Sequence, residues 1–531
     1  MNYQKNAKCF LFSLLGICLS SGLLAGTPGA QGEKIVFEVR TDLTYQMIDN
    51  FGASDAWRIA FVGKYWPVQK REQIADLLFS TRFDEKGSPV GIGLSNWRVN
   101  IGAGSYENRE NGEVTSPWNR TECFLSADGT YDFTKQAGQQ WFMQAAKERG
   151  VDDFLFFTNS APYFMTRSGT TLAPDKESIN LQTDCFDDFA DFLAVTTRHF
   201  IEKGFPVRYI SPINEPQIDW GANKWQEGSF ATNQDAYRLI TALDTALTRH
   251  RVPAKIVFGE VADMKYLFDC DTGRIPDNII EEFFTRSGKY AITGLSNVYN
   301  CVSAHDYWSA YPAETLVGLR QQIRSALSDA KNNTKLWASE YCILEKNEDI
   351  DGEPSPVKSM NLGLYVARII HADLAIANAS AWQWWTAISQ GEDVPIRIQP
   401  KKNATPESLK YDGIVSPTKM LWTTGNFSRF IRPGMWRISL ERSNHRISDE
   451  ETARSLMGSA YTDGKQVVLV FINYEDAPQK IKVKFAGSAK EKHKSRGKMY
   501  VTSIDRNLEF SGEPSLSELV IPARAVVTLV I

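Results

Sequence analysis

The segment VRYISPINEPQ, residues 207–217, combines a run of strand-forming residues with a sharp polar corner. Val207, Tyr209 and Ile210 favour a β-strand, and the Asn-Glu-Pro sequence that follows favours a turn. Glu215 therefore lies where a buried parallel strand gives way to its loop. This end of the strands is where a (β/α)8 barrel carries its functional residues.

A second segment has the same form. TKLWASEYCIL, residues 334–344, places Glu340 at the end of another apolar run. Either glutamate alone is compatible with an ordinary surface residue that flanks a core strand. Two carboxylates placed in this way can act as the acid and the nucleophile that cleave a glycosidic bond.

Short apolar runs alternate with longer helical patterns from about residue 50 to residue 390, which indicates repeated βα units and a parallel sheet. The expected strands are one near residue 50 and those at 94–100, 153–158, 207–214, 255–260, 302–307, 335–340 and 379–385. The expected helices are 69–78, 138–147, 186–203, 233–250, 276–284, 314–331 and 362–376. No glycine-rich GxGxxG loop follows the first strand, so the pattern predicts an α/β fold with a closed (β/α)8 TIM barrel rather than a doubly wound sheet.

The pattern changes past residue 425 to short alternating runs at 464–474, 479–487, 498–504 and 523–531, which predict an antiparallel β-sandwich. The segment KIVFEVR at 34–40 has no barrel partner and is expected to pair with this sheet. We therefore expect a signal peptide at 1–31, an N-terminal strand segment at 32–48, a catalytic barrel at 49–424 and a β-sandwich domain at 425–531. A long polar loop at 391–413 is expected to shape the rim of the site.

The N-terminus has the form of a secretory signal, with Lys5 and Lys8 before an apolar run and a small-residue exit. A membrane anchor is the alternative, but the run is only about 17 residues long and is interrupted by Ser and Gly. Bulky Ile17 disfavours lipidation of Cys18. We expect an exported protein, periplasmic or secreted, that does not insert into a membrane.

The composition limits the kinds of partner. A formal net charge of -4 and a pI near 6.0 provide no field that would attract nucleic acid or an anionic membrane. Aromatic residues make up 12% of the chain, which suits the stacking of sugar rings but also a large core. The five cysteines after the signal include no CxxC pair, so no zinc site is expected, although one or two disulfides remain open. We expect a monomer that binds a polysaccharide or oligosaccharide and uses no metal or organic cofactor.

Three further residues at predicted strand ends suit the same chemistry. Arg98, in LSNWRVN, can hold a nucleophilic carboxylate in its ionised form. His305 and Tyr307, in SAHDYW, alternate along a strand and so point the same way. The alternatives are a structural ion pair for Arg98, a hydrogen-bonded core histidine for His305 and simple barrel packing for Tyr307.

Aromatic and polar residues near the strand ends are candidates for sugar contacts. Trp382 and Trp384 share one strand face by alternation and are expected to line the site, with Trp385 facing the helices. The aromatic candidates on neighbouring loops are Trp57, Trp220 and Trp225, and the polar candidates for hydroxyl groups are Asp55, Asn159, Gln217 and Asn223. Core packing is the alternative for each tryptophan, and solvation or helix capping is the alternative for each polar residue.

These motifs resemble those of a known group of enzymes. NEP at 214–216, HDY at 305–307 and a glutamate ending the seventh strand are similar to the clan A glycoside hydrolases. LWTTGNFSRFIRPG at 421–434 resembles the segment that joins barrel and sandwich in glycoside hydrolase family 30, and the resemblance extends over nearly the whole mature chain. It implies that Glu215 is the general acid/base, Glu340 the nucleophile and Asn214 a ligand of the substrate 2-hydroxyl, with Arg98 and Tyr307 as supports for Glu340.

Within that family, FGASDAW at 51–57, NSAPYFMT at 159–166 and NEPQIDWGANKWQEG at 214–228 are most similar to the branch that contains endo-β-1,6-galactanases. The xylanase and glucosylceramidase branches carry a Trp-Ser-Pro-type corner after strand three, where this chain has Asn-Ser-Ala-Pro. The resemblance implies a retaining hydrolase of β-1,6-linked galactan or arabinogalactan side chains. A β-1,6-glucanase or an exo-acting β-glycosidase is the alternative within the class, and a non-catalytic carbohydrate-binding protein is the alternative from another class.

Overall fold

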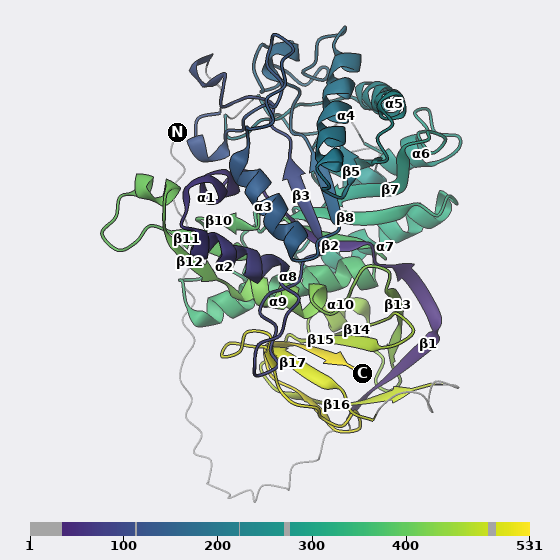
Figure 1. The fold of residues 1–531 in the computed structure, drawn as a ribbon. Coiled ribbons are helices and arrows are strands. Elements are labelled where there is room, and N and C mark those ends of the chain that lie inside the picture. Colours follow the sequence, from purple (N-terminus) through teal and green to yellow (C-terminus); the bar gives the residue numbers. More distant parts are fainter. Residues whose placement is uncertain (1–33, 112–113, 222–223, 270–276, 487–494) are drawn as a thin grey trace, which may run out of the picture. The chain divides into compact units, whose positions relative to one another are not determined.

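The computed structural model describes residues 34–111, 114–221, 224–269, 277–486 and 495–531. The described chain forms a closed barrel of eight strands, a nine-stranded sheet and a small three-stranded sheet (Figure 1). The predicted signal peptide at 1–31 lies outside the described residues. Within the described ranges, no helix is both long enough and apolar enough to cross a membrane.

The barrel strands are parallel and close in chain order. They are β2 (Asn50–Ser54), β3 (Asn96–Asn100), β4 (Asp153–Phe157), β5 (Val207–Ser211), β6 (Lys255–Val261), β7 (Val298–His305), β8 (Lys335–Tyr341) and β9 (Ala381–Trp384). Pairing of β2 with β9 completes the ring. Each predicted barrel strand overlaps one of these, and the (β/α)8 barrel is confirmed.

Helices separate the strands. They are α1 (Ile59–Tyr65), α2 (Val68–Phe79), α3 (Ala137–Glu148), α4 (Phe186–Glu202), α5 (Asn233–His250), α6 (Ile279–Phe284), α7 (Ala313–Asp329) and α8 (Pro356–Ala375). Helix α5 shows why the ends are well defined, because Thr232 and Asp235 form a reciprocal capping box at its start. All seven predicted helices overlap an observed one, and α1 is an addition.

The inside of the barrel is filled by side chains, as is usual for this fold. Leu155, Val257, Cys301, Trp337 and Ala381 form a buried apolar cluster. Polar residues at the amino ends of the strands are also buried and hydrogen-bonded to each other. The Asn50 amide at the start of β2, for example, donates to Asp153 at the start of β4 at 3.3 Å. Side chains at the carboxyl ends of the strands are therefore the ones placed to meet a ligand.

The second sheet has the strand order β18-β17-β20-β15-β14-β13-β1-β16-β19. Its strands are β1 (Ile35–Met47), β13 (Trp436–Arg442), β14 (Leu456–Thr462), β15 (Val467–Asn473), β16 (Gln479–Phe485), β17 (Lys498–Thr502), β18 (Glu509–Phe510), β19 (Leu519–Ile521) and β20 (Ala525–Val530). β1 pairs antiparallel with β13 but parallel with β16, so the sheet is mixed rather than purely antiparallel. The reason is that the N-terminal strand enters between two strands of the C-terminal region.

Strand β1 is drawn in purple beside the green and yellow strands of the C-terminal region in Figure 1. The predicted pairing of the N-terminal strand with the C-terminal sheet is therefore confirmed. Val501 of β17 and Ile521 of β19 stand near opposite ends of the strand order, yet they share one buried cluster. The sheet consequently curls around a core of its own.

The segment after the eighth barrel strand is more regular than expected. The predicted loop at 391–413 contains β11 (Ile396–Gln399), which pairs with β10 (Ile388–Ser389) and β12 (Ile414–Pro417) in the three-stranded sheet. Ile396 and Ile398 are buried while the residues between and after them are partly exposed, which is the two-residue alternation of a strand. That alternation is too short to stand out within a polar stretch.

Helix α9 (Lys419–Ser428) joins the barrel to the nine-stranded sheet and spans residue 425, where the sequence predicts the domain boundary. Ser428 donates to the carbonyl of Ile92 before β3 at 2.6 Å, and Asn426 donates to Thr528 of β20 at 3.0 Å. A short helix, α10 (Asp449–Ala453), connects β13 with β14. The cysteines of the described chain, Cys123, Cys185, Cys301 and Cys342, are unpaired, and Cys270 lies outside the described residues.

Candidate active site

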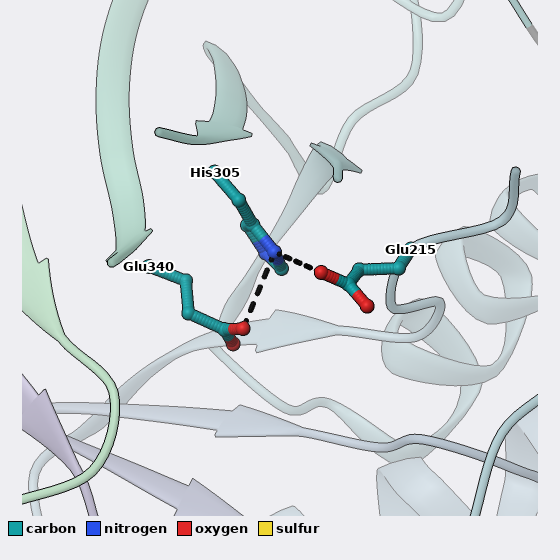
Figure 2. A group of neighbouring side chains, drawn as sticks. All are labelled: Glu215, His305 and Glu340. Atoms are coloured by element: carbon teal, nitrogen blue, oxygen red, sulfur yellow. Dashed lines mark hydrogen bonds and ion pairs between the residues drawn. The ribbon is translucent and has the colours of Figure 1, made fainter. Parts of the chain in front are cut away.

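Two glutamates meet at the carboxyl end of the barrel. Glu340 lies near the end of β8, and Glu215 lies in the loop that follows β5. Figure 2 shows the ring of His305 between their carboxylates, with Nδ1 2.9 Å from Glu215 Oε1 and 3.3 Å from Glu340 Oε1. One oxygen of each carboxylate and a ring nitrogen of His305 all lie within 4.8 Å of one another.

The backbone of Glu215 is held in an unusual conformation. Its φ of 45° lies in the left-handed region, which few residues other than glycine adopt. Its N–H donates to the carbonyl of Glu260 at 2.9 Å, and its carbonyl accepts from the Trp220 indole at 3.2 Å. Trp220 itself packs with Ala173 and Phe230 and is 7% exposed, so it supports the loop, and its predicted contact with substrate stays a prediction.

Arg98 lies on β3, is fully buried, and connects the carboxylates of Glu340 and Glu260. Its guanidinium donates to Glu340 Oε2, to Glu260 Oε2 at 2.8 Å and to Asn214 Oδ1 at 3.0 Å. It also lies 3.8 Å from the centre of the Phe157 ring. Burial alone would lower the pKa of Arg98, but the negative charges of Glu340 and Glu260 raise it. Arg98 is therefore a permanent cation at the site.

Tyr307 completes the support of Glu340. Its hydroxyl donates to Glu340 Oε1 at 2.8 Å, while Arg98 holds the other carboxylate oxygen. Burial raises the pKa of Tyr307 well above its usual value, so the hydroxyl keeps its proton and remains a donor. Donors on both oxygens fix the orientation of the Glu340 carboxylate.

Glu260 is a third carboxylate of the site and is absent from the sequence-based prediction. It accepts from Arg98 and lies 3.0 Å from His305 Nε2, and its side chain is fully buried. Burial would raise its pKa, but Arg98 and His305 lower the pKa to about 2. The signal was present in the sequence, because Glu260 ends the predicted strand KIVFGE just as Glu340 ends KLWASE.

His305 contacts all three carboxylates. Burial alone would lower its pKa, but Glu340 and the hydrogen bonds to Glu215 and Glu260 raise the pKa to about 10. At neutral pH both ring nitrogens therefore carry protons and donate to carboxylates. His305, Glu215 and Glu340 also present the donor atoms that a cation uses, and both ring nitrogens of His305 have carboxylate partners.

The environment of Glu215 favours its protonated form. Burial raises its pKa, and the negative Glu340 nearby adds to this effect, although His305 acts in the opposite direction. A carboxyl group that keeps its proton near neutral pH can protonate a leaving group. Glu215 and Glu340 thus sit in different environments only a few ångströms apart.

A cluster of aromatic side chains lies against Arg98. Trp57 and Trp385 belong to a small buried cluster with Phe157, and their rings are 5.1 Å apart. The Trp385 ring is also 5.7 Å from the Arg98 guanidinium. Trp225, which is 49% exposed, packs edge-on against Trp57 at 5.6 Å. Trp57 is itself only 1% exposed, so Trp225 is the exposed ring of this aromatic group.

The predicted orientation of the tryptophans of β9 is reversed. Trp382 and Trp384 lie in the main hydrophobic core, where the Trp382 indole donates to Asp373 of α8 at 3.0 Å. Trp385 points toward the site instead. Alternation shows which residues share a strand face, but it does not show which face is turned inward.

The predicted polar residues differ in how they are used. Asp55 and Asn159 are 2% exposed, and within the described chain Asp55 Oδ2 and both amide atoms of Asn159 have no hydrogen-bond partner. Burial raises the pKa of Asp55 to about 8. Gln217 accepts from the Ala262 N–H at 3.4 Å and so links two loops. Asn223 lies outside the described residues. Asp55 and Asn159 are thus buried polar groups with hydrogen-bonding capacity to spare, and their contact with a substrate stays a prediction.

A model of the protein family described as O-Glycosyl hydrolase family 30 matches residues 34–393. The chain belongs to this family. A crystal structure described as a conserved exported protein from Bacteroides fragilis is 59% identical, covers 93% of this chain and 100% of that chain, and superposes with a TM-score of 0.91.

Two curated relatives carry names that describe an activity. The endo-β-1,6-galactanase of Hypocrea rufa is 21% identical over 445 residues, which covers 80% of this chain and 82% of that protein. The exo-β-1,6-galactobiohydrolase of Bifidobacterium longum subsp. longum is 29% identical over 157 residues, which is 28% of this chain and 10% of that protein. The match to this second relative is therefore local.

Two aromatic residues near this family 30 site, Phe157 and Trp308, escape prediction from the sequence, and a third, Trp385, is predicted to face the helices. Phe157 ends β4 and covers Arg98, and Trp385 follows β9. Trp308 comes directly after Tyr307 and is 51% exposed. Their positions at strand ends are the only signal that the sequence offers, and the same signal marks many core aromatics.

Proposed function

We propose that this chain is a retaining glycoside hydrolase that cleaves β-1,6-galactosyl linkages by double displacement. The observation that carries the proposal is the separation of the two carboxylates, whose nearest oxygens lie within 4.8 Å. Retaining enzymes hold their two carboxyl groups about 5–5.5 Å apart, whereas inverting enzymes need roughly 6.5–9.5 Å to admit a water molecule.

In the first step, a Glu340 oxygen attacks the anomeric carbon and the bond to the leaving oxygen breaks. Glu215 gives its proton to that oxygen, so the leaving sugar departs neutral. Arg98 and Tyr307 aim the Glu340 carboxylate at the reacting carbon, because they bind its two oxygens. Asn214, held by Arg98, is proposed to bind the 2-hydroxyl of the same sugar.

In the second step, water breaks the ester and Glu215 takes its proton. Once Glu340 is esterified its negative charge is gone, and one cause of the raised pKa of Glu215 disappears with it. His305, protonated between Glu215 and Glu260, favours the ionised form of Glu215 at this stage. One residue can thus serve first as acid and then as base.

The substrate assignment rests on the relatives and on the groups around the carboxylates. The two curated relatives are named for β-1,6-galactan chemistry. Trp225, which packs against the buried Trp57, offers an exposed aromatic face for a sugar ring, and Asp55 and Asn159 offer unpaired polar atoms for hydroxyls. The same groups suit β-1,6-glucan, which differs by one axial hydroxyl. The apolar N-terminus and the exported Bacteroides relative support an exported protein that meets its polysaccharide outside the cytoplasm.

The test compares two substrates. The protein is incubated with de-arabinosylated arabinogalactan and, separately, with β-1,6-glucan, and the products are sized. We expect galacto-oligosaccharides from the first and nothing from the second. A ladder of products indicates endo action, and a single short product indicates exo action. Release from glucan alone would contradict the galactan assignment.

A Glu340→Gln variant separates an enzyme from a carbohydrate-binding protein. The amide keeps the size of the side chain but removes the nucleophile, so we expect turnover to be lost. Retained binding of the oligosaccharide in this variant shows that the site has not collapsed. A wild-type protein that binds galactan but releases no product would contradict the catalytic proposal.

A further inference from the structure

A cavity of about 340 Å³ lies between the barrel and the nine-stranded sheet, apart from the catalytic residues. Helices α7 and α8 form one wall, and β13, β14 and α10 form the other. None of the residues that line it belongs to the group around Glu215 and Glu340. Its volume falls within the range of about 300–1,000 Å³ that is usual for small-molecule sites.

The lining carries an excess of positive charge. The charged donors are Arg324, Arg368, Arg437, Arg442 and Arg446, and His371 lies among them. Glu441 and Asp449 are the acidic residues that line the same cavity. Guanidinium groups gathered in this way repel one another. Burial lowers the pKa of Arg437, and the positive charge of Arg324 adds to that effect.

Some of these arginines also have partners in the fold. Arg368 pairs with Asp349 at 2.7 Å, and Arg437 donates to Gln46 at 2.9 Å and to Asn378 at 2.6 Å. These contacts hold the guanidinium groups in place around the cavity. They use only part of the donors that line the cavity.

Other donors remain unused. His371 is 7% exposed, and its Nδ1 has no hydrogen-bond partner in the described parts of the chain. Arg442 Nε is likewise buried without a partner among the described residues. Burial and the nearby Arg437 lower the pKa of His371 to about 4, so its ring is neutral. A buried polar group without a partner destabilises the folded protein, and a bound ligand that supplies the missing hydrogen bond removes this cost.

We propose that this cavity binds an oxyanion and has room for the sugar ring that carries it. The planar fork of arginine matches a carboxylate or a sulfate through two parallel hydrogen bonds. Neutral His371 can add a hydrogen bond without adding charge. A carboxylated sugar and inorganic sulfate both offer arginine an oxyanion, and their relative affinities distinguish the two as the source of the ligand.

An adjoining cavity favours the sugar-borne source. Arg324 lines both cavities, and the second one is also lined by Tyr45 and Trp436, which are 41% and 44% exposed. The Arg437 guanidinium lies over the Tyr45 ring, 3.8 Å from its centre, so the Trp436 ring is the exposed aromatic face that suits a sugar with an acidic substituent. This site is independent of the catalytic proposal, because it uses other residues and needs no turnover.

The test is calorimetric titration of the full chain carrying Glu340→Gln, so that no turnover interferes. The titrants are sodium glucuronate, sodium sulfate and neutral galactose, at one ionic strength set with sodium chloride. We expect saturable binding of glucuronate and none of galactose at this cavity. Arg442→Gln and, separately, Arg324→Gln should weaken glucuronate binding about tenfold or more, since each removes a charged donor.

Arg208→Gln is the matched control. Arg208 lies on β5, is exposed and approaches Asp152 at 3.7 Å, and its replacement changes the net charge by the same amount. The glucuronate affinity of the Arg208→Gln variant should equal that of the Glu340→Gln protein from which it is made. Tighter binding of glucuronate than of sulfate identifies a sugar acid as the ligand source, and the reverse order identifies the inorganic ion. Absence of saturable binding of both anions, or equal losses in Arg442→Gln and Arg208→Gln, would overturn the proposal.

Discussion

His305 is the residue through which the three carboxylates of the site are connected. Its Nδ1 lies between Glu215 and Glu340, and its Nε2 faces Glu260. With Glu215 protonated, the charges of Arg98 and His305 are balanced by the two remaining carboxylates. The balance explains how so many charged groups can be buried together, since an unpaired buried charge is costly.

Glu260→Gln tests the part of this network that lies behind the reacting groups. The neutral amide cannot compensate the positive charges of Arg98 and His305. Loss of a hydrogen bond to a charged group costs about 1.5–3 kcal/mol, so we expect kcat to fall about 10- to 100-fold. Glu260 helps to raise the pKa of His305 to about 10. That pKa should drop in the variant, and activity should be lost at a lower pH on the alkaline side.

The measurement is kcat as a function of pH for both proteins. Glu281→Gln is the control, because Glu281 lies on the exposed side of α6. A variant with unchanged kcat and an unchanged alkaline limb would show that Glu260 has only a packing role. Binding of substrate should change little, because Glu260 does not face the sugar contacts proposed above.

At the residue scale, the sequence predicts the members of the site better than their surroundings. Glu215, Glu340, Arg98, His305 and Tyr307 do lie together, because parallel strand ends meet at one edge of a barrel. Their catalytic roles stay predictions. The inward-facing side of a strand depends on how the whole barrel closes, and this information is missing from any single segment.

At the scale of elements, α7, α8 and β9 are joined by a buried ion pair. Arg320 of α7 donates to Asp373 of α8 at 2.8 Å, and both side chains are fully buried. Asp373 also accepts from the Trp382 indole at 3.0 Å. Asp306 is 3.8 Å from Arg320 and is a weaker partner. The pair therefore holds β9, the strand that directly precedes Trp385.

Asp373→Asn should destabilise the protein by about 3 kcal/mol, because it leaves Arg320 buried without its main partner. Asp306 remains nearby, so the loss should not reach the upper end of the usual range. The measurement is the midpoint of urea unfolding. Asp329→Asn, at the exposed end of α7, is the control and should leave the midpoint unchanged. Equal midpoints for the two variants would contradict this role of the pair.

The elements themselves are largely predictable, and the exceptions have physical reasons. Helix α5 is predicted with its observed bounds because polar capping residues and an apolar stripe mark it clearly. β13 and β14 escape prediction, although WRISLER at 436–442 alternates, because they fall outside the runs of consecutive β-branched residues that mark β15 and β20. Local alternation identifies a strand only when its composition also stands out.

At the scale of the whole molecule, β1 ties the start of the described chain to its end. Val39 is fully buried and faces Leu440 of β13 on one side and Phe485 of β16 on the other. Val39→Pro removes an N–H from a strand that is paired on both sides, which a central strand tolerates poorly. We expect lower soluble yield and a lower thermal midpoint.

Leu43→Pro is the matched control for that prediction. Leu43 lies in the same strand, but it is 39% exposed and falls where the pairing with β13 shifts register. Its effect on yield and thermal midpoint should be clearly smaller. Similar effects of the two substitutions would show that the pairing of β1 with both neighbours is unimportant for stability.

The central claim is that Glu215 and Glu340 act by double displacement, and the configuration of the first product tests it most directly. Proton NMR spectra are recorded during hydrolysis of β-1,6-galacto-oligosaccharides, before the free sugar equilibrates in solution. Two successive inversions at the anomeric carbon preserve its configuration, so the β-anomer should appear first and the α-anomer only later. Initial release of the α-anomer would show a single inversion and would contradict the account.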